Sequence, residues 1–96
     1  MFIVSLTYHA PLEQIDAYLA EHVAFLKEQY AQGHFLASGR KVPRTGGIIL
    51  ARAASKETLE ALLHHDPFYR HDLARYDIVE FIPSMSSAEL AFLCES

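Results

Sequence analysis

Four stretches of the chain have the residue pattern of β-strands. The first stretch, residues 2–8, alternates between a mainly apolar set and a second set that contains Ser5 and Thr7, as in a strand with one buried face. Three further strands are predicted over residues 35–38, 47–53 and 76–82. The second and third strands are joined by a glycine-containing loop, residues 39–46, and so form a long hairpin.

Two other stretches have the three- and four-residue spacing of amphipathic helices. The longer one predicts a helix over residues 12–30, with Gly33 as its stop signal. The second begins after Ser55, a good N-cap, and must end before Pro67, which cannot continue a helix. A capping box at residues 86–89 predicts a short C-terminal helix.

The order of these elements, β-α-β-β-α-β, predicts an α+β fold of the ferredoxin-like type. Right-handed crossovers give a four-stranded antiparallel sheet with both helices on one face. Because the first and third strands carry apolar residues on both sides, the open face is expected to be covered by a second copy, giving a homodimer. The chain is expected to be a single domain over residues 1–96, with a core at 1–83 and a C-terminal extension at 84–96.

Charge and cysteine content exclude several classes of protein. The net charge is −4 with neutral histidines, and the one basic cluster, Arg40, Lys41 and Arg44, is too small for a nucleic-acid interface. Cys94 is the only cysteine, so neither an internal disulfide nor a cysteine-based metal site is expected. The N-terminus has no signal-peptide pattern and the chain no membrane-length apolar run, so we expect a cytoplasmic protein that binds no membrane.

One ionisable residue, His22, interrupts the apolar stripe of the long helix between Leu19 and Leu26. Asp66 lies at the end of the second helix, and the predicted topology places both helices against one sheet. A carboxylate that accepts the ring N–H would fix the tautomer and raise the basicity of the other nitrogen, which is the start of general acid–base catalysis. The alternative is a histidine at the edge of the core bonded to a backbone carbonyl, with Asp66 only capping the turn at Pro67.

The hairpin loop is a candidate binding site. The hairpin segment 38–47 has three glycines, which let backbone N–H groups approach a ligand, and Arg40 and Arg44 can pair with a carboxylate, so it would hold an anion. The alternative is an ordinary solvated loop whose glycines serve turn geometry.

The remaining histidines do not predict a metal site. His64 and His65 are adjacent on a helix and point about 100° apart, which prevents easy chelation of one ion. His9, His34 and His71 are explained by strand-end, loop or helix-end positions. No metal or organic cofactor is expected.

Five short motifs together resemble the YciI-like (YCII-related) proteins, over Met1 to about Pro83. The motifs are Glu21-His22-Val23-Ala24-Phe25-Leu26, Gly33-x-Phe35-Leu36-Ala37-Ser38-Gly39, Gly46-Gly47-Ile48-Ile49, Asp66-Pro67-Phe68 and Val79-Glu80-Phe81. The resemblance implies a ferredoxin-like domain of the dimeric α/β barrel type, with a site at His22 and Asp66 and with Ser38 near the cleft. Many members have proline where Arg40 follows Gly39 here, and this departure points to an anionic ligand.

The resemblance also indicates the kind of reaction. A relative that eliminates chloride from a hydroxylated aromatic ring, and the similar muconolactone isomerases, imply an architecture that moves protons on small cyclic acids. We therefore expect a cofactor-independent lyase or isomerase that acts on a small carboxylate or lactone-like anion through a His22–Asp66 dyad. The expected substrate contacts are Ser38, Gly39, Arg40, Arg44 and Phe68. The alternative is a non-catalytic domain that binds a small metabolite in the same pocket, or an accessory homo-oligomeric domain.

Overall fold

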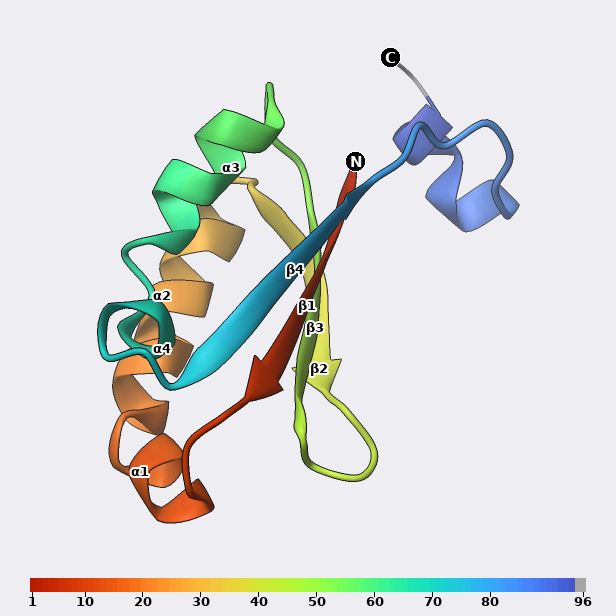
Figure 1. Cartoon of the computed structure of the whole chain (residues 1–96). Helices are drawn as coiled ribbons and strands as arrows, with labels where there is room; N and C mark the ends of the chain where they lie inside the picture. The colour runs from red at the N-terminus through yellow and green to blue at the C-terminus, as the bar shows by residue number, and fades with distance from the viewer. Residues whose placement is uncertain (95–96) are drawn as a thin grey trace.

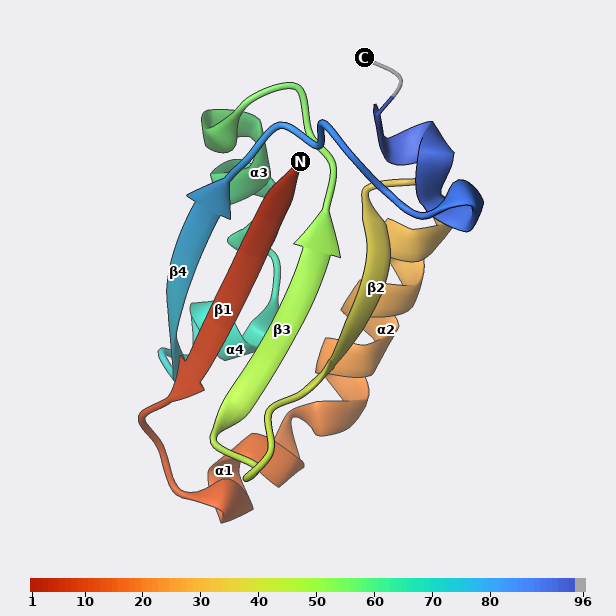
Figure 2. The same cartoon turned by 90° about the vertical axis from the view of Figure 1, so that its right-hand side faces the viewer.

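One antiparallel sheet of four strands is covered on one face by helices (Figure 1). The computed structural model describes residues 1–94. Its elements are β1 (Phe2–Tyr8), α1 (Leu12–Ala17), α2 (Leu19–Ala31), β2 (Phe35–Arg40), β3 (Gly46–Ala51), α3 (Lys56–Leu63), α4 (Pro67–Arg70), β4 (Ala74–Glu80) and the 3-10 helix η1 (Ala88–Cys94). The strands lie in the order β2-β3-β1-β4 (Figure 2), which confirms the predicted ferredoxin-like arrangement.

The alternation in β1 assigns its residues to the two faces of the sheet. Phe2, Val4 and Leu6 are buried under the helices, whereas Ile3 lies on the open face beside its partners in β3 and β4. The helix-facing side holds the core, which consists of Phe2, Val4, Leu6, Ile15, Phe25, Phe35, Ile49, Ala51, Leu59, Leu63, Phe68, Leu73 and Ala74. The sheet therefore has one buried face and one open face.

The region predicted as one helix over residues 12–30 forms two helices, α1 and α2, so the prediction of a single helix was wrong. Tyr18, at φ −107° and ψ 5°, leaves the helical conformation between α1 and α2. Its ring stacks on the imidazole of His71, with ring centroids 4.1 Å apart. The local sequence pattern gives no reason for a helix to end at Tyr18. The break instead coincides with this tertiary contact to His71.

The hairpin between β2 and β3 is tighter than predicted, because β2 continues to Arg40, which pairs with Gly47. Gly46 has a structural role at the start of β3. A Cβ atom there would lie 1.7 Å from the backbone oxygen of Leu6, so only glycine allows β1 and β3 to pair at this point. This glycine therefore serves strand pairing, a role that neither interpretation of the loop had given it.

The second helical region also contains two helices. Ser55 caps α3, as predicted, and accepts a hydrogen bond of 3.1 Å from the backbone N–H of Thr58. After α3 ends, the Asp66 side chain caps the short helix α4, which begins with Pro67. The last strand, β4, then begins and ends two residues earlier than the predicted range of 76–82.

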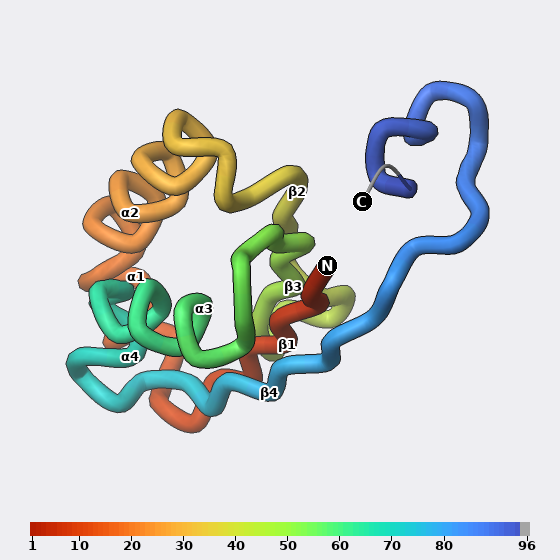
Figure 3. The backbone as a smooth tube through the Cα atoms, turned by 90° about the horizontal axis from the view of Figure 1, so that it is seen from above, coloured from red at the N-terminus to blue at the C-terminus, as the bar shows by residue number. Residues whose placement is uncertain are grey.

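The C-terminal segment after β4 extends away from the domain, on the side opposite the helices (Figures 1 and 3). The predicted capping box does not form, because Ser86 donates its hydroxyl to the carbonyl of Ser87, and residues 88–94 form the 3-10 helix η1. Leu90 and Phe92 on η1 are exposed. Within residues 1–94, no helix combines the length and apolar character that crossing a membrane requires.

Candidate active site

His22 on α2 and Asp66 between α3 and α4 lie in direct contact, although 44 residues separate them in the sequence. His22 Nδ1 is 2.8 Å from Asp66 Oδ1. The Asp66 side chain is fully buried, and that of His22 is 12% exposed. The two side chains therefore lie next to each other, as expected. Of the pair, only the imidazole of His22 is partly exposed to solvent.

The Asp66 carboxylate accepts three hydrogen bonds. Oδ1 accepts from His22 Nδ1 and, at 3.0 Å, from the backbone N–H of Phe68, while Oδ2 accepts from the hydroxyl of Tyr76 at 2.5 Å. Because an ionised carboxylate only accepts, Nδ1 carries the proton of a neutral His22 and Nε2 keeps its lone pair. Asp66 thus caps α4 and also forms a hydrogen bond with His22.

Phe68 supports the imidazole from behind. Its ring lies parallel to that of His22, with centroids 4.0 Å and planes 9° apart. The Phe68 side chain is fully buried and packs edge-on against Tyr8. It does not line the pocket described next, so its place is under His22 and not among direct ligand contacts.

A pocket of about 180 Å³ opens beside His22, between α2 and the helix-facing side of the sheet. Its walls are mostly apolar and include Leu6, Leu19, Val23, Leu26 and Ile49. The polar side chains in the wall are those of Tyr8, His22, Ser38 and Arg40. The pocket therefore combines one imidazole with one guanidinium in mostly apolar surroundings.

The pocket explains why part of the predicted apolar stripe on α2 is exposed. Leu19 and Val23 are both 37% exposed, because they line the pocket and do not pack against the sheet. Phe25 and Gln29 are the buried residues of α2. The prediction that the whole stripe faces the core was wrong, and the misplaced positions mark the pocket wall.

Ser38 and Arg40 reach the pocket from β2. Ser38 pairs with Ile49 and Arg40 with Gly47, which puts both on the side of the sheet that faces α2. The Ser38 hydroxyl lies 2.5 Å from that of Tyr30 on α2. Among residues 1–94, Arg40 forms no salt bridge, so its guanidinium is available to an anion at the pocket.

Arg44, the other arginine of the loop, is held elsewhere. Its guanidinium donates a hydrogen bond of 2.5 Å to Asp16 of α1. This hydrogen bond, with the negative charge of Asp16, raises the pKa of Arg44. Burial raises the pKa of the nearby Tyr8 hydroxyl, although the positive charge of Arg44 acts in the opposite direction. Arg44 does not line the pocket and serves to fasten the loop to α1.

Four of the other five histidines have separate structural partners, and the fifth, His65, lines a hollow that lacks His22. His9 bonds to Asp72, His34 to Gln29, and the rings of His64 and His71 stack on Tyr69 and Tyr18. In the described part of the chain, no group of three His, Cys, Asp or Glu side chains is arranged to hold a metal ion.

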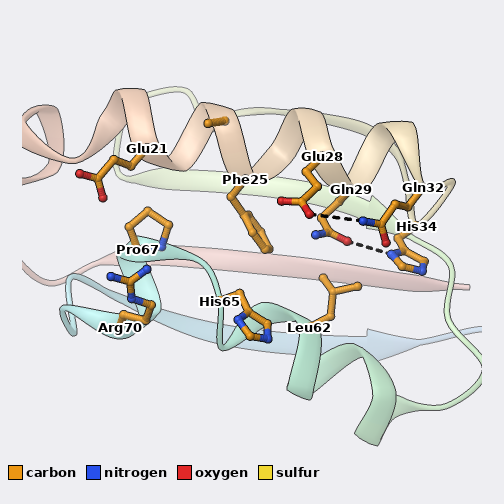
Figure 4. A pocket seen from close by; sticks show the side chains of 11 residues that line it. Glu21, Phe25, Glu28, Gln29, Gln32, His34, Leu62, His65, Pro67 and Arg70 are labelled. Atoms are coloured by element: carbon orange, nitrogen blue, oxygen red, sulfur yellow. Dashed lines mark hydrogen bonds between the residues drawn. The ribbon is translucent and has the colours of Figure 1, made fainter.

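A second, larger hollow of about 550 Å³ lies between α2 and the α3–α4 region (Figure 4). It is lined by Glu21, Phe25, Glu28, His65 and Arg70, among others, and the Gln29–His34 hydrogen bond of 2.8 Å closes one end. Neither His22 nor Asp66 lines this hollow. The larger hollow is therefore separate from His22 and Asp66. We place the candidate active site in the smaller pocket, which His22 lines.

Tyr76 and Tyr30 belong to the site but were not predicted from the sequence. Tyr76 alternates with Ala74 and Ile78 along the core-facing side of β4. A tyrosine on the core-facing side of a strand needs a hydrogen-bond partner for its hydroxyl, and this requirement could have indicated a buried acceptor near Tyr76. Tyr30 gave no comparable signal, because its stripe position fits a simple packing role.

Comparison with known proteins places the chain in a family. None of the curated protein sequences matches it. Among solved structures, it is similar to 5-chloro-2-hydroxyhydroquinone dehydrochlorinase from Burkholderia phenoliruptrix, in complex with 2,5-dihydroxybenzoquinone. The TM-score is 0.70 at 18% identity, over 84% of this chain and 93% of that chain. This likeness establishes the fold, a ferredoxin-like domain of the dimeric α/β barrel type. The model of the YCII-related domain matches residues 1–82, and the chain therefore belongs to the YCII-related domain family.

Proposed function

We propose that this protein is a small enzyme that moves a proton on a small anionic substrate, with His22 as general acid or base and Asp66 as the residue that orients it. The observation that carries the proposal is the 2.8 Å hydrogen bond between His22 Nδ1 and the fully buried Asp66, at the wall of an apolar pocket. Apolar walls limit competition from water for Nε2. This equipment suits a lyase or isomerase, since removal of a proton by a base starts both kinds of reaction.

In the proposed reaction, Nε2 of neutral His22 removes a proton from a carbon or hydroxyl of the substrate. The electron pair of the broken bond forms a new double bond. In a lyase, the leaving group departs as an anion with its own bonding pair. In an isomerase, the new double bond displaces the electron pair of a conjugated double bond, and that pair takes the proton back from His22 at another carbon. The imidazolium formed in the first step is stabilised by the negative charge of Asp66.

The size and charge of the pocket favour a ligand with a single ring. A buried cavity of about 150 Å³ holds benzene, so 180 Å³ accommodates roughly one substituted six-membered ring. Arg40, with the Ser38 hydroxyl, would bind a carboxylate or enolate on that ring. The structurally similar dehydrochlorinase was solved with 2,5-dihydroxybenzoquinone, which supports a hydroxylated ring as the substrate class.

The first test is a ligand screen by thermal shift with single-ring carboxylic acids, hydroxyquinones and lactones. We expect a ligand whose affinity falls by about tenfold or more in Arg40→Ala, because a charge-assisted hydrogen bond is lost. Arg44→Ala is the matched control from the same loop. Its side chain pairs with Asp16 outside the pocket, so affinity should remain near that of the wild type. Equal losses in both variants would contradict the proposed role of Arg40.

Proton transfer is then tested on any ligand found, by following deuterium incorporation from D₂O with NMR. The wild type should exchange a ligand proton or form product. Tight binding with neither exchange nor product would favour the alternative, a non-catalytic domain that binds a small acidic metabolite.

The open face of the sheet leads us to propose a homodimer. Ile3, Ile48, Val79 and Phe81 are all exposed, with Val79 at 59%, and a monomer would leave them in water. The C-terminal segment, with exposed Leu90 and Phe92, extends on the same side of the sheet (Figure 1). A second copy of the same chain would cover this face with self-complementary apolar contacts.

Val79→Glu is expected to convert the dimer to a monomer, because each two-fold interface would bury two unpaired carboxylates. Sedimentation velocity measures the change. Val42→Glu is the matched control, since Val42 is 93% exposed in the hairpin loop. A wild-type protein that sediments as a monomer, or a Val79→Glu protein that remains a dimer, would contradict this interface.

A further inference from the structure

Tyr76 on β4 reaches the dyad from the sheet. Its hydroxyl donates a 2.5 Å hydrogen bond to Asp66 Oδ2, the carboxylate oxygen that His22 does not use. Burial and, next to it, the negative charge of Asp66 raise the pKa of the Tyr76 hydroxyl well above its usual range. The hydroxyl therefore stays protonated, and remains a donor, throughout the pH range in which histidines titrate.

We infer that Tyr76 is a positioning residue that limits how strongly Asp66 holds a proton on His22. Three donors share the negative charge of Asp66: the Tyr76 hydroxyl, the Phe68 N–H and the His22 ring. Each donor that stabilises the carboxylate leaves a weaker attraction for the imidazolium. Tyr76 thereby makes His22 a weaker base than it would be beside Asp66 alone, which favours release of the proton at the end of a turnover.

The direction of the effect follows from the charge of the dyad before and after proton uptake. With neutral His22, the dyad carries a single negative charge on Asp66. After uptake of one proton it is neutral overall, whichever side chain holds the proton. A hydrogen-bond donor stabilises the more negative state more, so the Tyr76 hydroxyl lowers the pH at which the dyad takes up its proton. Removal of the hydroxyl raises that pH.

Other charged or titratable groups also face His22, and a change at Tyr76 leaves them in place. Tyr8 of β1 and Arg40 of β2 line the same pocket, and Arg44 lies beside Tyr8. Glu21, the neighbour of His22 on α2, lines the larger hollow. None of these side chains forms a hydrogen bond with Asp66, so a shift in Tyr76→Phe reports the loss of one donor to the carboxylate.

The test is a pH titration of the His22 ring protons by NMR in the wild type and in Tyr76→Phe, with the His22 signals assigned by their loss in His22→Asn. The titration midpoint is expected to rise by about one pH unit in Tyr76→Phe. Tyr69→Phe is the matched control. The Tyr69 ring packs against that of Tyr76, with centroids 5.7 Å apart, but its hydroxyl does not bond to Asp66, so the midpoint should equal that of the wild type.

An unchanged or lower midpoint in folded Tyr76→Phe overturns the inference. If that variant does not fold, 3-fluorotyrosine placed at position 76 keeps the test open. Fluorine makes the hydroxyl a stronger donor, so the midpoint should fall, and an unchanged or higher midpoint overturns the inference. The inference rests on the proposed function for its catalytic consequence, but the titration needs no substrate. An unchanged titration midpoint would therefore contradict the role of Tyr76, whereas a lack of activity would contradict the proposed function.

Discussion

His22→Asn is expected to lower the turnover of a substrate of this protein by about a thousandfold, within the range of about 10² to 10⁴ that a positioned general base contributes. Asparagine places an N–H near the position of Nδ1, so a hydrogen bond to Asp66 Oδ1 is retained while the base is lost. The change lies at the pocket wall, where His22 is 12% exposed, and the fold should persist. Measured kcat and KM, with circular dichroism of the same sample, separate lost chemistry from lost structure.

The matched control for this experiment is His34→Asn. His34 also donates or accepts through Nδ1 at 2.8 Å, with Gln29 as its partner, but it lies at the larger hollow away from the dyad. Its replacement should leave kcat within about twofold of the wild type, as for most substitutions outside a site. A His22→Asn enzyme that retains more than about a tenth of the wild-type kcat would remove His22 from the role of general base.

The topology was the part of this molecule that local sequence patterns could predict, and the same patterns singled out His22 and Asp66 as candidate residues. Alternation in residues 2–8 and the helical spacing that follows determine the strand–helix order, and that order leaves few arrangements of the sheet. His22 was recognisable because an ionisable ring interrupts an apolar stripe, and Asp66 because Pro67 requires a helix to end beside it. Packing both helical regions on one sheet face made contact between the two side chains possible, and the resemblance to the YCII-related proteins favoured it, but only the structure shows the 2.8 Å hydrogen bond.

Features set by tertiary contacts were not predictable from local pattern. The break at Tyr18 accompanies stacking on His71, which is 53 residues away in the sequence. Leu19 and Val23 have the spacing of core residues, but they line a pocket whose existence depends on the position of β2. The pairing of Arg44 with Asp16 depends on how the hairpin loop folds back onto α1, and local spacing contains no information on that contact.

Asp66→Ala is expected to lower the free energy of unfolding by about 3–5 kcal/mol, the range found when one partner of a buried polar network is removed. The substitution leaves the Phe68 N–H, the Tyr76 hydroxyl and the His22 N–H without their acceptor in the core. Denaturant unfolding of the variant and the wild type measures the difference. Glu60→Ala is the surface control. It removes a carboxylate that is 48% exposed and 4.0 Å from Lys56, and should cost less than about 0.5 kcal/mol.

Asp66→Asn separates the structural role of this residue from its proposed catalytic role. The amide oxygen can still accept from His22 and from the Phe68 N–H, and only the Tyr76 hydroxyl must change from donor to acceptor, so the stability loss should be about 1–2 kcal/mol. The negative charge beside the imidazolium is lost completely. We therefore expect kcat to fall by about 10² to 10⁴. If Asp66→Asn retained the wild-type kcat while Asp66→Ala unfolded readily, Asp66 would be a helix cap and core acceptor with no part in proton transfer.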